Sequence, residues 1–143
     1  MTQTLSGQGY RAAPYHADTT DQARKKSQNA FINEDADIIV ATVAFGMGID
    51  KSNDRYVIHA AMPKSLEHYQ QASGRAGRDG LEAECCLFYS GFDYLTWKRI
   101  LQNYEPQMLE MGAAKLEQMY GYCCGVSCRH RDEKARAVWR TEF

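Results

Sequence analysis

The sequence lacks the features of a membrane or exported protein. None of its apolar runs approaches the roughly 20 residues that a membrane-spanning helix needs. Its first ten residues, MTQTLSGQGY, have neither the basic n-region nor the apolar h-region of a secretory signal. It also has few prolines, three in 143 residues, and no low-complexity stretch. Collagen-like and wholly disordered chains are therefore excluded, and we expect a globular protein that does not insert in a membrane.

Neither sign of charge is in excess, and cysteines are few. Seventeen Lys and Arg oppose eighteen Asp and Glu, so any basic surface must come from local placement rather than from net charge. The cysteine number is odd, at five, and includes two adjacent pairs. A disulfide framework is therefore not expected, and a reducing intracellular setting fits best. That setting is the bacterial cytoplasm, or the nucleus if the source is eukaryotic.

Short strand signals alternate with helix signals along most of the chain. Strands are predicted at 11–16, 37–42, 55–61 and 84–89, and helices at 19–34, 65–73, 91–103, 107–121 and 127–139. Asp18 and Ser65 are the expected starts of the first two helices. This order predicts an α/β fold with a parallel sheet covered by helices, followed by a helical extension after about residue 104.

A loop rich in glycine and arginine is the sharpest local feature. The predicted loop is 74–80, and it ends the segment Gln71-Ala-Ser-Gly-Arg75-Ala-Gly-Arg78-Asp-Gly. Arginine presents five donors in a fixed fork that suits phosphate oxygens, and glycine lets the backbone approach a ligand closely. The loop therefore predicts either a triphosphate sensor or a surface turn with solvated charges, and the spacing alone does not separate the two.

A second glycine loop follows a buried strand. The segment 41–51, ATVAFGMGIDK, runs from an apolar strand through Gly46 and Gly48 to Asp50. Ligands gather at the carboxyl ends of strands in open α/β sheets, so Thr42 could contact phosphate and Asp50 a ribose hydroxyl. A plain exit from the strand is the alternative, and in isolation it is the simpler explanation.

Taken in order, these segments resemble a known family. ATVAFGMGIDK (41–51), RYVIH (55–59) and QASGRAGRDG (71–80) resemble the second RecA-like lobe of superfamily-two helicases, and most closely the RecQ family of DNA helicases. The resemblance implies a partial RecA-like, P-loop NTPase-like sheet over 1–104 that lacks its first strand. Residues 105–143 would be the truncated start of a zinc-binding subdomain. The implied activity is ATP-dependent 3′–5′ unwinding of DNA, with Mg²⁺.

The resemblance also implies roles for particular residues. Arg75 and Arg78 would face the γ-phosphate of ATP as catalytic residues, with Arg78 as the arginine finger, and Gln71 would couple ATP to the interface between lobes. Gly46, Gly48 and Asp50 would line the nucleotide. The implied nucleic-acid contacts come from His16, Arg24 and Thr42. For Arg24, a solvated helix face is the alternative.

The cysteines divide into two groups. Cys85 and Cys86 fall on a predicted strand and are expected to be small apolar fillers. Cys128 resembles the first zinc ligand of the RecQ family, but the further cysteines of that site are absent from the sequence. Closed structural zinc sites take four ligands, and helical geometry does not gather Cys123, Cys124, Cys128 and His130 at one point. We therefore expect zinc, a cofactor of the family, to be missing here.

The resemblance covers one lobe of a two-lobe motor. No Walker A loop, GxxxxGK[ST], occurs in the sequence, so the first RecA-like lobe is an expected partner. The resemblance also implies single-stranded and duplex DNA as partners. The isolated chain is expected to be inactive. A sheet without its first strand has an exposed edge, which predicts possible self-association. A non-catalytic module that binds nucleic acid or a partner, and a lobe of an RNA-acting translocase, are the other functions considered.

Overall fold

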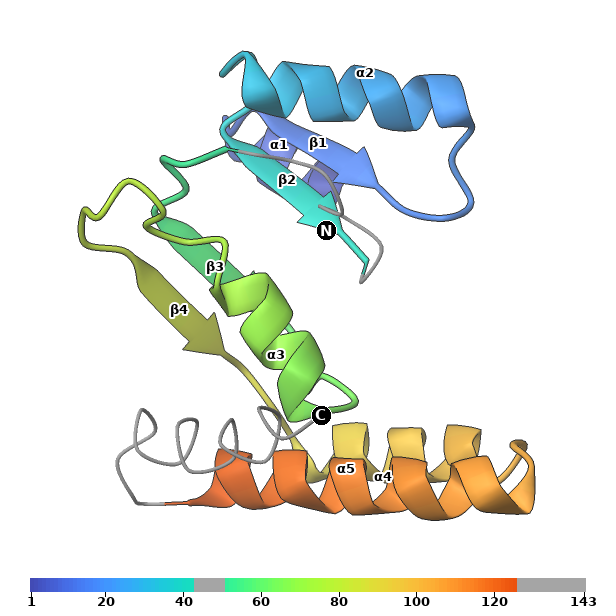
Figure 1. The fold of residues 1–143 in the computed structure, drawn as a ribbon. Helices are drawn as coiled ribbons and strands as arrows, with labels where there is room; N and C mark the ends of the chain where they lie inside the picture. Colours follow the sequence, from blue (N-terminus) through green and yellow to red (C-terminus); the bar gives the residue numbers. More distant parts are fainter. Residues whose placement is uncertain (43–50, 126–143) are drawn as a thin grey trace. The chain divides into compact units, whose positions relative to one another are not determined.

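The computed structural model describes residues 1–42 and 51–125, and Figure 1 shows their helices and strands. Contacts within the chain group it into two compact units. The first is Met1–Lys51 and the second begins at Ser52. Each unit is described by itself below. The grouping does not test the boundary expected at 104–105, which stays a prediction, and the glycine loop at 45–48 and the helix expected at 127–139 lie outside the described residues.

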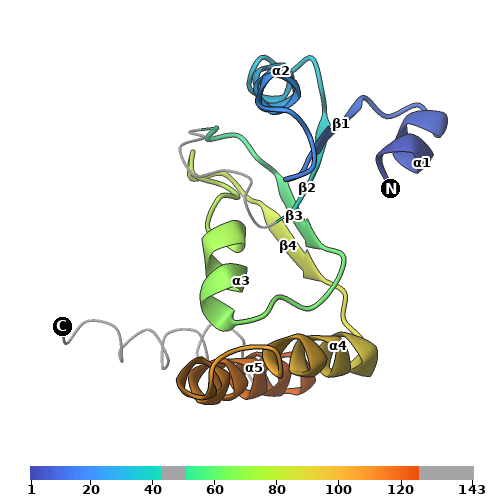
Figure 2. The same cartoon turned by 90° about the vertical axis from the view of Figure 1, so that its right-hand side faces the viewer.

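The first unit is a parallel strand pair connected by a helix. Its elements are α1 (Thr2–Gly7), β1 (Ala12–Tyr15), α2 (Asp21–Ile32) and β2 (Ile38–Ala41). β1 and β2 pair in parallel from Ala12 opposite Ile38 to Tyr15 opposite Ala41. α2 packs on both strands as the crossover between them, and Figure 2 shows this helix nearly end-on. The strands predicted at 11–16 and 37–42 are thereby confirmed, with their parallel pairing.

The start of α2 differs from the prediction. Thr20, not Asp18, is the N-cap, and its side chain accepts a hydrogen bond from the Ala23 amide at 3.3 Å. The residues before it form a turn, in which the Thr19 hydroxyl donates to the His16 carbonyl at 2.6 Å. Because this turn occupies 16–19, the helix begins two residues later than the acidic pattern suggested. Asp21 then lies in the first turn, where a negative charge favours the helix dipole.

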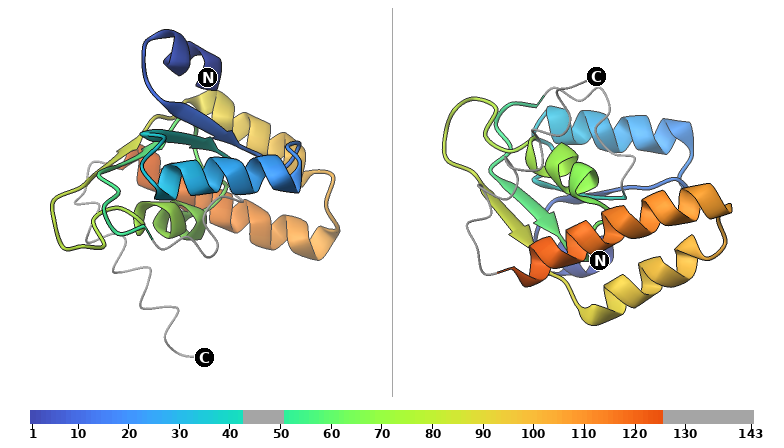
Figure 3. Two further views of the ribbon diagram at one scale, coloured as in Figure 1. Left: turned by 90° about the horizontal axis from the view of Figure 1, so that it is seen from above. Right: turned by 60° about the horizontal axis from the view of Figure 1, so that its bottom comes forward.

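The second unit joins a parallel strand pair to a helical hairpin. Its elements are β3 (Tyr56–His59), α3 (Leu66–Ser73), β4 (Glu84–Leu87), α4 (Gly91–Leu101) and α5 (Pro106–Cys124). β3 and β4 are parallel, with Tyr56 opposite Glu84. Ser65 caps α3, as predicted, by accepting from the His68 amide at 3.4 Å. α4 and α5 lie side by side in both views of Figure 3.

The core of the second unit lies among its helices. α5 contributes one apolar stripe, Leu116, Met119, Tyr122 and Cys123, which packs against Met62, Leu66 and Tyr69. The rings of Tyr69 and Tyr122 are 5.4 Å apart. From α4, the Trp97 indole donates to the Met62 carbonyl at 2.8 Å, so that its polar atom is satisfied beside the core. These contacts fix α3 against α5.

The strands are less covered than predicted. The described residues form two sheets of two strands each, and in β3 the side chains of Tyr56 and Ile58 are 66% and 61% exposed. Cys85 on β4 is also exposed and Cys86 is half-buried. The expectation that both cysteines are buried fillers is therefore wrong for Cys85. The reason is that the apolar core of this unit forms on the helices, whereas the sequence pattern suggested a sheet covered on both faces.

A charged pair also joins α3 to α5. The Lys115 ammonium lies 3.2 Å from the Glu67 carboxylate. Partial burial by itself raises the pKa of Glu67, but hydrogen bonds from Ser65, from the backbone and from Lys115 outweigh it and lower the pKa to about 2. Among the described residues, no helix is both long and apolar enough to span a membrane.

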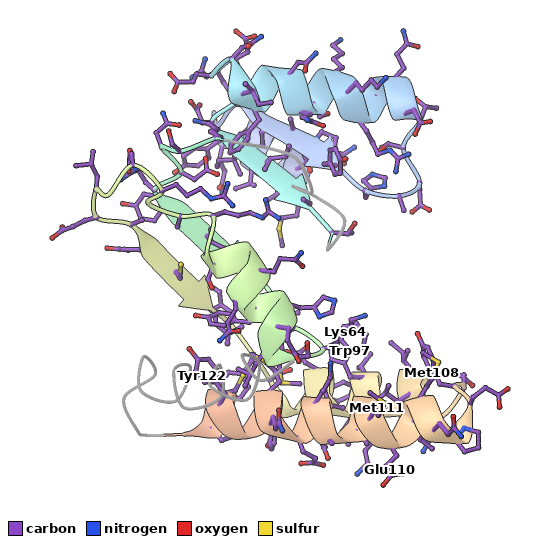
Figure 4. All side chains as sticks on the ribbon, viewed as in Figure 1. Lys64, Trp97, Met108, Glu110, Met111 and Tyr122 are labelled. Atoms are coloured by element: carbon purple, nitrogen blue, oxygen red, sulfur yellow. The ribbon has the colours of Figure 1, made fainter. Side chains whose placement is uncertain are left out.

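We expect Met119→Ala to lower the free energy of unfolding by about 2–5 kcal/mol, because it opens a cavity at a side chain with no exposure. Met111→Ala is the matched control on the same helix (Figure 4), since Met111 is 66% exposed and its loss should change stability by at most about 0.5 kcal/mol. Urea unfolding followed by circular dichroism measures both. Equal effects of the two substitutions would contradict the core described above.

The Glu67–Lys115 pair predicts a pH dependence. Because the folded-state pKa of Glu67 is depressed, its contribution to stability is complete above the ordinary value of 4.5 and is lost as the pH falls towards about 2. Lys115→Met should raise the pKa of Glu67, measured from its ¹³C carboxyl shift. The melting-temperature difference from the unsubstituted chain should shrink between pH 5 and pH 2. A pKa that does not move would show that Lys115 has no part in the shift.

Candidate functional site

The glycine–arginine loop connects α3 to β4 in the second unit. Gly74 ends α3, with its amide bonded to the Gln70 carbonyl at 2.9 Å. The loop then returns the chain to the start of β4, where the Glu84 amide donates to the Arg55 carbonyl at 2.8 Å. The loop therefore lies at the amino-terminal edge of the β3–β4 pair, beside the segment that leads into β3.

That segment, 52–55, holds the loop by its backbone. The Gly77 amide donates to the Asp54 carbonyl at 2.9 Å, and the Asp79 amide donates to the Ser52 carbonyl at 3.2 Å. Within the loop, the Gly80 amide reaches the Gly77 carbonyl at 3.0 Å. The loop is thus fixed at several points rather than being a loose surface turn.

The Arg55 side chain adds a second set of contacts to the same loop. Its Nη2 lies 2.6 Å from both carboxylate oxygens of Asp79. Its Nη1 donates to the Glu82 carbonyl at 2.9 Å and its Nε to the Asn53 carbonyl at 3.1 Å. One guanidinium therefore connects the end of the loop that leads into β4 to the segment before β3.

The electrostatics of the loop depend on these neighbours. The hydrogen bond from Arg55 lowers the pKa of the Asp79 carboxyl, and the Leu81 amide contributes in the same direction. Burial lowers the pKa of Arg75, and the positive charge of Arg78 lowers it further, while the carboxylate of Asp54 opposes both. Two guanidinium groups are thus held near each other on one short loop, an arrangement that an anion would stabilise.

Two glycines of the loop have positive φ, for different structural reasons. Gly77 has φ of 65°, and a Cβ there would lie 2.8 Å from the Leu81 carbonyl oxygen. Gly80 has φ of 81°, but a Cβ there would meet nothing within 4 Å. Gly77 is therefore required by both conformation and space, whereas Gly80 is required by conformation alone.

The structure brings two of the predicted nucleic-acid residues to one edge of the first sheet. His16 follows β1 and Thr42 follows β2, and the last paired residues of these strands are Tyr15 and Ala41. The Thr42 amide donates to the Tyr15 carbonyl at 3.2 Å, which continues the strand pairing by one step. Arg24 lies near the start of α2, where its guanidinium pairs with Asp21.

The other residues predicted to act in nucleotide or metal binding lie partly inside and partly outside the described residues. Gln71 is exposed in the last turn of α3, directly before the loop. Gly46, Gly48, Asp50 and Cys128 lie outside the described residues. Within 1–42 and 51–125, no three His, Cys, Asp or Glu side chains gather in a way that could hold a metal ion. Cys123 there is buried in the core and Cys124 is exposed.

The sequence reasoning missed the contact between Arg55 and Asp79. The two residues are 24 positions apart, and neither stands out by itself. A signal was nevertheless present, because residues that directly precede neighbouring parallel strands meet at the same sheet edge. Arg55 precedes β3, and the loop with Asp79 precedes β4.

Comparisons with known proteins define the class of this chain. Residues 1–80 match the family model of the helicase conserved C-terminal domain. Since the match covers more than half of the 143 residues, the chain belongs to this family. The family explains the strand–helix order of the first unit and of β3 and α3, and the α/β class predicted from the sequence is confirmed.

Its relatives are RecQ helicases. The chain is 44% identical over 122 residues to the ATP-dependent DNA helicase RecQ of Bacillus subtilis (strain 168), which is 85% of this chain and 21% of that protein. It is 52% identical over 103 residues to the RecQ-like DNA helicase BLM of Xenopus laevis, covering 71% of this chain and 8% of that protein. It is 40% identical over 149 residues to the ATP-dependent DNA helicase Q1 of Rattus norvegicus, and this alignment covers 99% of this chain and 22% of that protein.

These similarities identify the chain as a RecQ-family helicase C-terminal lobe, and the resemblance predicted from its motifs is confirmed. The chain spans about a fifth or less of the length of these relatives. The activity, substrates and partners of such whole proteins are therefore taken up as proposals for this chain.

The two loop glycines give a matched pair of substitutions. Gly80→Ala should lower the free energy of unfolding by about 1–2 kcal/mol, the cost of a left-handed conformation for alanine. Gly77→Ala should cost clearly more, because its Cβ also meets the Leu81 carbonyl. Urea unfolding followed by Trp97 fluorescence in a Trp139→Phe background measures both. A Gly77→Ala protein as stable as Gly80→Ala would contradict the close approach of the loop backbone.

Proposed function

We propose that this chain is the second RecA-like lobe of a RecQ-like, ATP-dependent 3′–5′ DNA helicase. In this proposal, Arg75 and Arg78 face the γ-phosphate of ATP across the interface with a first RecA-like lobe. The observation that carries the proposal is the loop itself, which carries Arg75 and Arg78 three residues apart on a backbone that hydrogen bonds fix to segment 52–55. The RecQ relatives, whose names describe ATP-dependent DNA helicases, support it.

The geometry suits stabilisation of developing negative charge. Donors that are fixed before reaction stabilise a transition state without a reorganisation cost, and an arginine finger can accelerate phosphoryl transfer by about 10³–10⁵-fold. Arg78 Nε donates to the Gly74 carbonyl at 3.3 Å, which anchors one edge of its guanidinium on the loop. Arg78 is therefore our choice for the finger, and Arg75 for the phosphate sensor. Gln71, one turn before the loop, would couple the nucleotide to the lobe interface.

The first unit would supply part of the DNA track. His16 and Thr42 follow two neighbouring parallel strands at one sheet edge, and Arg24 lies on the helix that follows β1. We propose that these three residues contact the DNA backbone and that Gly46, Gly48 and Asp50 contact the nucleotide. Contacts to phosphate make such binding strongly dependent on salt.

The proposed reaction requires a partner lobe. The sequence has no Walker A loop to cradle the phosphates of ATP with Mg²⁺, so we propose that the isolated chain has little ATPase activity and no helicase activity. What its own residues contribute is positive charge at the γ-phosphate and a surface for one DNA strand. The first lobe of a RecQ helicase is therefore the partner that an experiment should provide.

A chimera tests this proposal. This chain replaces the matching segment of Bacillus subtilis RecQ, and ATP hydrolysis is measured with and without single-stranded DNA. We expect DNA-stimulated hydrolysis, and a loss of about 10³-fold in kcat for Arg78→Ala because the transition-state charge is no longer neutralised. Arg78→Lys should restore little, since lysine lacks the planar fork.

The control is Arg99→Ala, which removes an exposed arginine in the last turn of α4 and should leave kcat unchanged. A folded chimera without DNA-stimulated ATPase, or one in which Arg78→Ala and Arg99→Ala behave alike, contradicts the proposal. Single-stranded RNA of equal length is tested in parallel, because stronger stimulation by RNA would replace the DNA helicase with an RNA translocase.

A further inference from the structure

The Arg55 side chain and the Asp79 carboxylate form a charged contact that joins the arginine loop to the segment before β3. The side chains are 31% and 25% exposed, so the pair is partly withdrawn from water. The chain offers a comparison in the Arg11–Asp37 pair of the first unit, whose side chains are 59% and 50% exposed. Both pairs use two donors or acceptors at once, but Arg55 also donates to the Asn53 carbonyl of its own segment and to the Glu82 carbonyl just before β4.

We propose that Arg55 is a positioning residue for the arginine loop, acting through Asp79 to set where Arg78 presents its guanidinium group. This inference rests on the proposed function, in which Arg78 faces phosphate. It assigns Arg55 no contact with nucleotide, because its nitrogens are directed at acceptors of the loop and of segment 52–55.

The path from Arg55 to the finger is short. Asp79 is the neighbour of Arg78 in the chain, and Arg78 Nε is bonded back to the Gly74 carbonyl. Gly77, the residue directly before Arg78, donates its amide hydrogen bond to the Asp54 carbonyl. A shift of Asp79 therefore displaces Arg78 directly, whereas the two ends of the loop remain attached to α3 and β4.

Segment 52–55 also acts electrostatically on Arg75. Asp54 accepts from Gly77 through its backbone, while its carboxylate acts on the Arg75 guanidinium and raises the pKa of that group against the effects of burial and Arg78. Arg55 is the next residue in the chain and fixes this segment to Asp79. Both arginines thus depend on one frame, residues 52–55.

The alternative is that Arg55 and Asp79 contribute to stability alone. A merely stabilising pair would change the unfolding transition without changing the rate of the chemical step. A positioning pair changes kcat while leaving KM for ATP nearly unchanged, and its effect disappears when the finger is already absent. These two readouts separate the explanations.

The first test uses the full chain and measures amide hydrogen exchange of Gly77 by NMR. Asp79→Asn keeps an acceptor for the Leu81 amide but removes the charge that binds Arg55. We expect exchange at Gly77 to become about tenfold faster, the effect of losing one charge-assisted hydrogen bond. Arg55→Lys, which keeps the charge and loses the fork, should act in the same direction. Asp37→Asn, the matched control, should leave Gly77 unchanged.

The second test uses the RecQ chimera and measures kcat and KM for ATP. Asp79→Asn and Arg55→Lys should each lower kcat by about 10²-fold, the loss expected from misplacing a catalytic group by about 1 Å. Asp37→Asn should leave kcat unchanged. The double variant Arg78→Ala with Asp79→Asn should be no slower than Arg78→Ala alone, because Asp79 acts through Arg78.

The outcomes distinguish the two proposals. If Arg78→Ala leaves kcat unchanged, the proposed function fails. If Arg78→Ala abolishes turnover while Asp79→Asn leaves kcat at its original value, the positioning role is overturned and the proposed function stands. Equal losses of kcat in Asp79→Asn and Asp37→Asn would likewise overturn it, since the effect would then be one of general stability.

Discussion

The contact between Arg55 and Asp79 is the interaction on which the candidate site depends. The segment 74–80 has three glycines in seven residues, so it has many accessible conformations, and fixing one of them costs conformational entropy. Here the cost is offset by backbone hydrogen bonds to Ser52 and Asp54 and by the Arg55 guanidinium, which binds Asp79 and the Glu82 carbonyl at the end of the loop that leads into β4. Charge-assisted hydrogen bonds are the strongest of these, so the order of the loop rests largely on them.

In the function that we propose, this frame is what lets a lobe without a Walker A loop act on a nucleotide. The helical core of the second unit, built on Met119 and Leu116, fixes α3, and α3 ends where the loop begins. Segment 52–55 fixes the other side of the loop next to β3. Charges presented in this way are preorganised, which is the property that electrostatic stabilisation of a transition state requires. Phosphoryl transfer is the reaction that we propose for this arrangement, and the name of the RecQ relative from Bacillus subtilis, an ATP-dependent DNA helicase, supports it.

Much of this could be predicted from the sequence because the signals were local. The alternation of strands and helices, the Ser65 cap and the arginine loop all depend on residues close together in the chain. The predictions that were wrong also have physical causes. Asp18 was chosen as a cap, but a turn stabilised by Thr19 moved the start of α2 to Thr20. Cys85 was expected to be buried, but the core formed on helices and left that strand residue exposed.

The sequence by itself determined the family, the α/β class and the residue types of the candidate site, since motif spacing and hydrophobic periodicity are properties of short segments. The tertiary structure decided which distant residues meet. Arg55 and Asp79 come together because β3 and β4 pair in parallel and bring the residues before each strand to one edge. His16 and Thr42 come together for the same reason at the carboxyl edge of β1 and β2. Strand register is set by pairing between segments far apart in the chain, and no local pattern contains it.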